Sequence, residues 1–111
     1  MKRAACIATV ILLLLCGLSI SIAAPKKMMH SVSMDNMKFD PTELQVNVGD
    51  TVEWTNNDDR DHNVTSKDGS FKSPNLSNGA SYKYTFKQAG KFGYACSLHP
   101  RMKGSITVAP E

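Results

Sequence analysis

The chain has 111 residues, with 13 lysines and arginines against 10 aspartates and glutamates, a size typical of one small domain. Lys2 and Arg3 lie in an apolar leader, and removing them leaves 11 of the 13 basic residues against the 10 acidic ones, a net charge of +1. A nearly neutral domain with scattered charges lacks the basic stripe that nucleic-acid binding needs. Of the three cysteines, only Cys96 lies beyond the leader, so the mature domain cannot form an internal disulfide.

The first 23 residues predict a secretory signal peptide, because two basic residues precede an apolar run that ends in small residues. We expect cleavage after Ala23, or after Ala24, which would leave residues 24–111 as one periplasmic domain without stable membrane insertion. Retention of the leader as an anchor is the alternative, since the apolar stretch approaches the roughly 20 residues that span a bilayer. A lipoprotein is disfavoured, because the large Leu15 precedes Cys16.

The segment after the leader is rich in methionine and is expected to run into a first strand. Its thioether and imidazole donors are Met28, Met29, His30, Met34 and Met37. Such donors suit Cu(I), but methionine also commonly fills gaps in apolar cores. Strand alternation would place Met28, His30 and Met34 on one face and Met29 on the other. We therefore favour a packing role over a second copper site and expect Met37 in the core.

The rest of the chain predicts short β-strands separated by turns, as in an all-β sandwich. Apolar residues alternate along residues 44–48, 52–54, 82–86 and 105–108. This period of two gives each strand one side that can face a core. Gly49-Asp50 predicts a turn, and the charged run at residues 56–61 is expected to be a solvated loop. No segment shows a convincing helical period.

The stretch Cys96-Ser97-Leu98-His99-Pro100-Arg101-Met102 carries a thiol, an imidazole and a thioether between two expected strands. Together with a second imidazole, these side chains form the set of two histidines, one cysteine and a weak axial methionine that suits a blue-copper electron-transfer site. The stretch has no carboxylate, which argues against calcium or magnesium. The alternative is that the cysteine and methionine are ordinary core side chains.

The Cys-x-x-His-x-x-Met spacing, followed by a glycine and a final strand, resembles the ligand loop of the cupredoxin family, and its short length is most similar to amicyanin. The resemblance continues through residues 37–39, 48–52, 54, 62–64 and 68–71. It implies a cupredoxin-like Greek-key β-sandwich of about seven to eight strands that binds one type 1 copper.

The resemblance implies the metal ligands His62, Cys96, His99 and Met102. It also implies a role for Asn63, which follows the first of these histidines. Asn63 would bond to the Ser97 hydroxyl and offer its N–H to the Cys96 sulfur. Such outer contacts fix the orientation of metal ligands.

The chain departs from the family pattern at residues close to the expected site. Leu98 and Asp61 stand where the family often has proline. The Leu98 N–H would be a second donor to the thiolate sulfur and favour Cu(I), whereas the Asp61 carboxylate would favour Cu(II). Arg101 replaces a residue that is often aromatic, so we expect Pro100 and Arg101 on a rim where partners dock.

These features predict an exported, monomeric electron carrier and not an enzyme, because a closed ligand shell leaves no position for a substrate. The resemblance implies a periplasmic dehydrogenase or cytochrome as the redox partner, with electrons passing through the edge of His99. The main alternative is a periplasmic protein that carries, stores or delivers copper. A structural or adhesive sandwich would leave the spacing of Cys96, His99 and Met102 unexplained.

Overall fold

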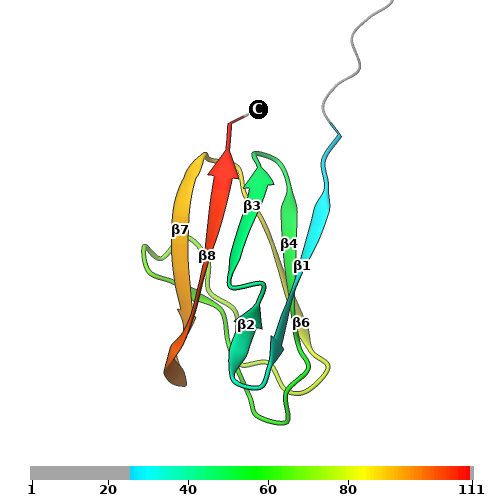
Figure 1. Ribbon diagram of the computed structural model, residues 1–111, viewed down its shortest axis with the longest axis vertical. Coiled ribbons are helices and arrows are strands. Elements are labelled where there is room, and N and C mark those ends of the chain that lie inside the picture. Colours follow the sequence, from blue (N-terminus) through cyan, green and yellow to red (C-terminus); the bar gives the residue numbers. More distant parts are fainter. Residues whose placement is uncertain (1–25, 111) are drawn as a thin grey trace, which may run out of the picture.

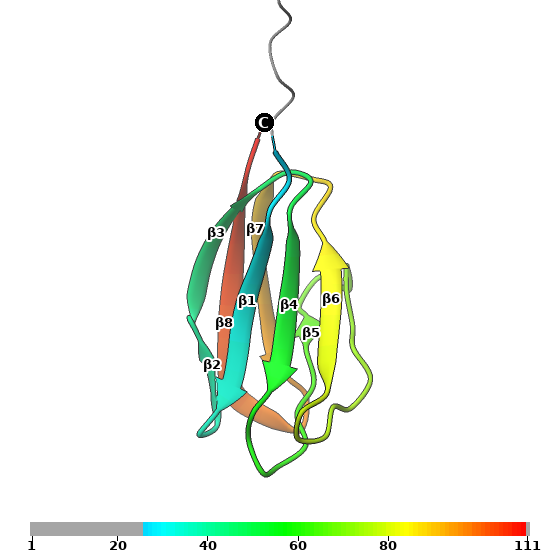
Figure 2. The same cartoon turned by 90° about the vertical axis from the view of Figure 1, so that its right-hand side faces the viewer.

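The computed structural model describes residues 26–110, which form eight β-strands and no helix (Figure 1). The strands are β1 (Met29–Asp35), β2 (Lys38–Asp40), β3 (Glu43–Asn47), β4 (Thr51–Asn56), β5 (Thr65–Ser66), β6 (Ser81–Thr85), β7 (Gly90–Cys96) and β8 (His99–Ala109). Two sheets, ordered β2-β1-β4-β6 and β3-β8-β7-β5, face each other (Figure 2). Each sheet mixes parallel and antiparallel pairs, and the predicted all-β Greek-key sandwich is confirmed.

The predicted signal peptide, residues 1–23, and both expected cleavage positions lie outside the described residues. Within residues 26–110, no helix has the length and the apolar character needed to cross a membrane.

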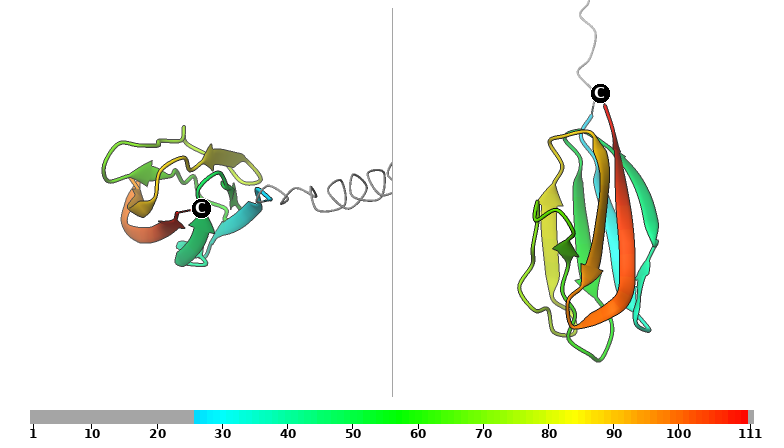
Figure 3. Two further views of the ribbon diagram at one scale, coloured as in Figure 1. Left: turned by 90° about the horizontal axis from the view of Figure 1, so that it is seen from above. Right: turned by 90° about the vertical axis from the view of Figure 1, so that its left-hand side faces the viewer.

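Three connections lie together at the end of the sandwich away from the C-terminus (Figures 1 and 2). They are the β1–β2 turn, the loop after β4, and the link between β7 and β8. The last is short, because Cys96 pairs with His99 and leaves only Ser97 and Leu98 between the strands. Figure 3 shows β7 and β8 side by side above this link. The sequence predicted ligands on a wider connection, whereas hydrogen-bonded pairing extends the strands into it.

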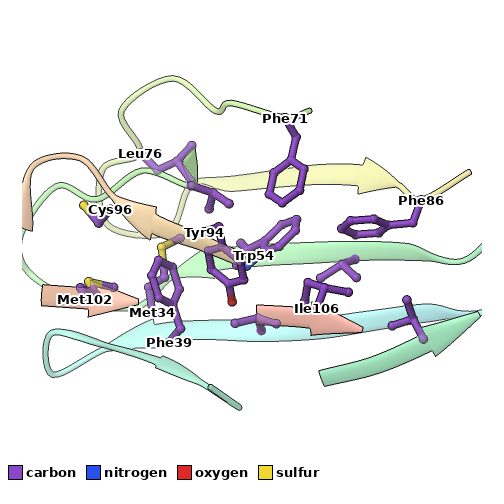
Figure 4. Packing of buried hydrophobic residues seen from close by; sticks show 14 of the residues in the cluster. Met34, Phe39, Trp54, Phe71, Leu76, Phe86, Tyr94, Cys96, Met102 and Ile106 are labelled. Atoms are coloured by element: carbon purple, nitrogen blue, oxygen red, sulfur yellow. The ribbon is translucent and has the colours of Figure 1, made fainter. Parts of the chain in front are cut away.

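Apolar side chains from both sheets fill the space between them. Trp54 of β4 stacks on Phe71 with ring centroids 5.6 Å apart and meets Tyr94 of β7 edge-on at 5.4 Å. Figure 4 shows these rings in the middle of the core, with Cys96 and Met102 at one end. Burial of this aromatic surface drives the two sheets together, and the core therefore continues directly into the side chains that were predicted to bind metal.

The methionine-rich segment does not gather at one point. Met34 is fully buried in the core, whereas Met28 and Met29 are 55% and 54% exposed. The imidazole of His30 contacts a carboxylate near the start of β1. Met37, which was expected in the first strand and in the core, lies instead in the β1–β2 turn and is 37% exposed. The structure thus favours separate roles for these residues over a shared copper site.

Tyr94 occupies the space that a side chain at Gly104 would need. The two residues pair in the β7–β8 ladder, and a β-carbon on Gly104 would lie 2.5 Å from both Cζ and the hydroxyl oxygen of Tyr94. Burial raises the pKa of Tyr94 to about 12, so the phenol stays neutral. The missing side chain at Gly104 therefore lets Tyr94 lie against β8, two residues beyond Met102.

Gly104→Ala should lower the free energy of unfolding by about 1–3 kcal/mol, because the added methyl group overpacks the core against Tyr94. Urea denaturation monitored by Trp54 fluorescence measures the change. Gly93→Ala is the matched control in the same ladder, since its β-carbon would meet only the flexible side chain of Lys67, at 3.3 Å. Equal destabilisation by the two substitutions would contradict this account.

At the opposite end of the sandwich, hydrogen bonds of the Asp50 carboxylate hold the start of β1 in place. The carboxylate accepts the backbone N–H groups of Asn47 and Met28, both at 3.0 Å, and lies 2.9 Å from Nε2 of His30. These contacts, led by the Asn47 N–H, lower the pKa of Asp50 to about 2, although burial opposes the shift. The folded protein therefore stabilises the ionised carboxylate.

Asp50→Asn should change how stability depends on pH. Because the pKa of Asp50 falls from 3.8 to about 2 on folding, its contribution to the free energy of unfolding is complete above about pH 4 and is lost as the pH falls toward 2. The variant should be less stable than the wild type near neutral pH, and the gap should narrow between about pH 4 and pH 2. Urea denaturation at both ends of this range tests the expectation. A gap independent of pH would contradict it.

Candidate metal centre

Four side chains with metal-binding atoms come from the end of the sandwich that carries the three connections. Cys96 is the last residue of β7, His99 is the first residue of β8, and Met102 follows on the same strand. His62 comes from the loop after β4, where two backbone hydrogen bonds to Leu76, at 3.1 and 2.7 Å, fix its position. A β-ladder therefore positions three of the predicted ligands, and a backbone bridge positions the fourth.

The Cys96 sulfur and the His62 imidazole face each other inside the protein. Sγ lies 3.8 Å from Nδ1, and both residues are fully buried. Two ligand atoms at about 2.0 and 2.3 Å from one metal ion, at the angle of about 120° of a trigonal site, would be about 3.7 Å apart. The observed separation therefore suits a metal ion bound by both atoms.

The other two predicted ligands are more exposed than this pair, by different amounts. Met102 is 4% exposed, whereas His99 is half-buried, with its ring centroid 5.0 Å from that of His62. Among residues 26–110, no three His, Cys, Asp or Glu side chains are already drawn together around one point. A thiol, two imidazoles and a thioether fit copper in the type 1 arrangement.

Asp58 orients the imidazole of His62. Its Oδ2 lies 2.9 Å from Nε2 of His62 and accepts the Met37 N–H at 3.0 Å. These contacts, that of His62 most, lower the pKa of Asp58, so the carboxylate is ionised and can only accept hydrogen bonds. Nε2 of His62 therefore carries the proton. The lone pair of Nδ1 is left facing the Cys96 sulfur, as metal binding requires.

Asn63 connects the His62 loop to the β7–β8 link. Its backbone N–H donates to Sγ of Cys96 at 3.4 Å, and its side-chain amide donates to the Ser97 hydroxyl at 2.7 Å. Its side-chain oxygen accepts the Ser97 N–H at 2.8 Å. The amide also donates to Asn75, at 3.0 Å, a contact that the sequence analysis missed because no local pattern marks Asn75. This network holds the two ligand-bearing segments together.

Leu98 and Asp61, the residues expected to tune the metal, are both exposed beside the predicted ligands. Leu98 is 45% exposed, and its N–H is not among the donors to the Cys96 sulfur in the described residues. Asp61 is also exposed, and the structure of residues 26–110 gives its carboxylate no ion pair. The acidic residue that reaches His62 is Asp58, four positions earlier. The sequence analysis singled out Asp61 because it stands where the family often has proline, and it did not identify Asp58, which the loop brings to the His62 ring.

A pocket of about 400 Å³ opens beside His99. It is lined by Met37, Leu98, His99, Pro100, Arg101 and Met102. Pro100 and Arg101, the residues expected on a docking rim, are both exposed here. Two of the predicted ligands, His99 and Met102, thus line a pocket at the protein surface.

A β-sandwich that carries two histidines, a cysteine and a methionine at one end, three of them on its last two strands, has the architecture of the type 1 copper proteins. The sequence profile of the cupredoxin-like domain matches residues 5–108. The chain belongs to this cupredoxin family. Cupredoxin and amicyanin homologues bind one type 1 copper ion, which makes copper the cofactor that this ligand set serves.

Individual relatives cover the chain to different extents. Amicyanin of Paracoccus denitrificans is 38% identical over 82 residues, which span 69% of this chain and 63% of that protein. An amicyanin variant in the oxidised state superposes with a TM-score of 0.69 at 35% identity, covering 73% of this chain and 82% of the other. A copper-containing nitrite reductase from Thermus scotoductus gives a TM-score of 0.70 at 33% identity, covering 82% of this chain but 24% of the enzyme. The chain is therefore similar to a small cupredoxin and to one part of a larger enzyme.

Asp58→Ala should weaken copper binding about 10–100-fold, because the imidazole of His62 loses the partner that sets its tautomer and orientation. Competition with a copper chelator of known affinity measures the loss. Asp61→Ala removes an exposed carboxylate three residues away and should leave the affinity near that of the wild type. Similar losses in the two variants would mean that general charge, and not the Asp58 contact, sets the affinity.

Proposed function

We propose that this protein is a single-electron carrier that binds one copper ion through His62, Cys96, His99 and Met102. The observation that carries the proposal is the buried pair of Cys96 and His62, with Sγ and Nδ1 3.8 Å apart and Nε2 held by an ionised carboxylate. When bound, copper would supply a one-electron step between Cu(II) and Cu(I). The soft sulfur donors suit Cu(I), and the imidazoles suit copper in general.

The contribution of the chain is to hold the donor atoms still. Backbone pairing fixes Cys96 against His99, and Asp58 fixes the ring of His62. The Asn63 N–H donates to the cysteine sulfur, which also faces Nδ1 of His62. A ligand set that changes little between oxidation states loses little energy to rearrangement, which suits an electron carrier. Metal ligation would also protect the thiolate of Cys96, the one cysteine among residues 26–110, in an oxidising compartment.

His99 connects the centre with the surface. It is half-buried, whereas each of the other three proposed ligands is at most 4% exposed. The exposed side chains of Leu98 and Pro100 form an apolar rim beside it, and Arg101 adds a cation. We infer that a periplasmic dehydrogenase or cytochrome docks on this rim and exchanges electrons through the imidazole edge. The proposed carrier is a monomer.

Two other functions make different use of the same site. An enzyme would need an open position for substrate, and the four donors proposed here complete the type 1 set, which supports a carrier. A periplasmic copper carrier or delivery protein would instead give up Cu(I) to a partner. Reversible oxidation and reduction without loss of the metal would distinguish the electron carrier from the delivery protein.

Addition of Cu(II) should produce an intense visible absorption from charge transfer between the Cys96 thiolate and copper, and reduction should abolish it. Cys96→Ser should lack this absorption even when copper is bound, because the thiolate is the source of the transition. Met102→Leu is the control, since it removes only the weak axial donor and should keep the absorption. A colourless Cu(II) adduct of the wild type would contradict the proposed function.

A further inference from the structure

Met37 occupies a turn position that disfavours a side chain. The β1–β2 hairpin has a two-residue connection, and both Asn36 and Met37 have positive φ, 51° and 62°. Such turns prefer Asn followed by Gly, because glycine adopts positive φ without steric cost. Asn36 follows this preference and Met37 does not. A side chain kept in an unfavourable backbone conformation motivates a functional hypothesis.

The location of Met37 suggests what this function is. Its side chain is 37% exposed and lines the pocket of about 400 Å³ together with His99 and Met102. Its backbone N–H is held by Oδ2 of Asp58, the same oxygen that contacts Nε2 of His62. The Asp58 carboxylate therefore links the β1–β2 turn to the predicted ligand His62. The turn presents a thioether where the centre meets the solvent.

Copper must reach donors that lie inside the protein. Cys96 and His62 are fully buried and Met102 is 4% exposed, so the half-buried His99 is the proposed ligand that solvent reaches first. A metal site needs an access path as well as ligands. The pocket beside His99 is lined by two of the four proposed ligands, His99 and Met102, and the polarizable thioether of Met37 is a soft donor suited to Cu(I).

We propose that Met37 and His99 form a transient capture site for Cu(I) at the mouth of this pocket. The proposal rests on the proposed function, since the captured ion ends in the same copper centre. Bonds from Cu(I) to a donor ligand break as bonds to the Met37 thioether and the His99 imidazole form. Cys96 then releases its thiol proton to solvent, and its thiolate replaces the Met37 sulfur. The oxidation state of copper does not change, so no oxidant or reductant is needed.

Met37→Leu tests the role of the sulfur, because leucine keeps an apolar side chain of similar volume. Reduced apoprotein is mixed with Cu(I) bound to bicinchoninate, and the loss of chelator colour reports the loading rate. We expect the variant to load about tenfold more slowly, equivalent to about 1.4 kcal/mol in activation free energy. Its final copper content should equal that of the wild type, because Met37 is absent from the final ligand set.

Two further variants test whether slower copper loading is due specifically to the loss of the Met37 sulfur. Met29→Leu removes another exposed thioether, about 20 Å away at the far end of β1, and should load at the wild-type rate. Met37→Gly suits the positive φ of the turn, so it should fold well yet load as slowly as Met37→Leu.

Wild-type loading rates in Met37→Leu, or equal slowing in Met29→Leu, would overturn the capture site. The rate is read from the chelator and not from the colour of the loaded protein. Failure of the capture site is therefore distinguishable from failure of the electron-carrier proposal, which a colourless Cu(II) adduct would show.

Discussion

The arrangement of the metal-binding end of the sandwich depends on the hydrogen bonds of the Asp58 carboxylate. One of its oxygens meets Nε2 of His62 and the Met37 N–H, which joins the loop after β4 to the β1–β2 turn. Asp58 is only 8% exposed, and hydrogen bonds to a shielded, charged acceptor are stronger than those in water. This single group thereby decides which nitrogen of His62 faces Cys96. It also fixes the position of the β1–β2 turn, which carries Met37.

The opposite end of the sandwich repeats the same chemistry. Asp50 accepts backbone N–H groups and contacts His30, as Asp58 does with His62. Strand β1 lies between the two, so one carboxylate ties its start to the sheet and the other ties the turn that follows it. With both ends of β1 held, its pairing with β4 is difficult to shift, and the turn keeps a constant position relative to the metal centre.

Three of the proposed ligands are held rigidly by their surroundings, whereas the fourth is accessible to solvent. Cys96, His62 and Met102 lie within or against the packed core, where neighbouring side chains restrict their movement. His99 begins β8 directly after the exposed Leu98, so it shares the stability of the ladder while remaining open to solvent. In the two proposals made above, this one half-buried imidazole would serve both the exchange of electrons with a partner and the exchange of copper with a donor. The surrounding ladder need not open for either.

The sequence by itself determined the inward faces of the strands and indicated a candidate donor set. Alternation at Val52 and Trp54 is a local property with a period of two, and both side chains are buried. The spacing of Cys96, His99 and Met102 is equally local, because all three lie on one hairpin. The pattern therefore carried the fold class and the ligand candidates without knowledge of distant contacts.

Only the tertiary structure decided which carboxylate reaches His62 and where Met37 lies. Asp61 is next to His62 in the chain, but the loop folds back and brings Asp58 to the ring. Met37 is an apolar residue that follows Val32 and Met34 closely in the chain, yet the pairing of Asp35 with Lys38 leaves it in a two-residue turn. Both outcomes depend on how separate segments meet in space, and residue type and spacing within one segment do not encode that meeting.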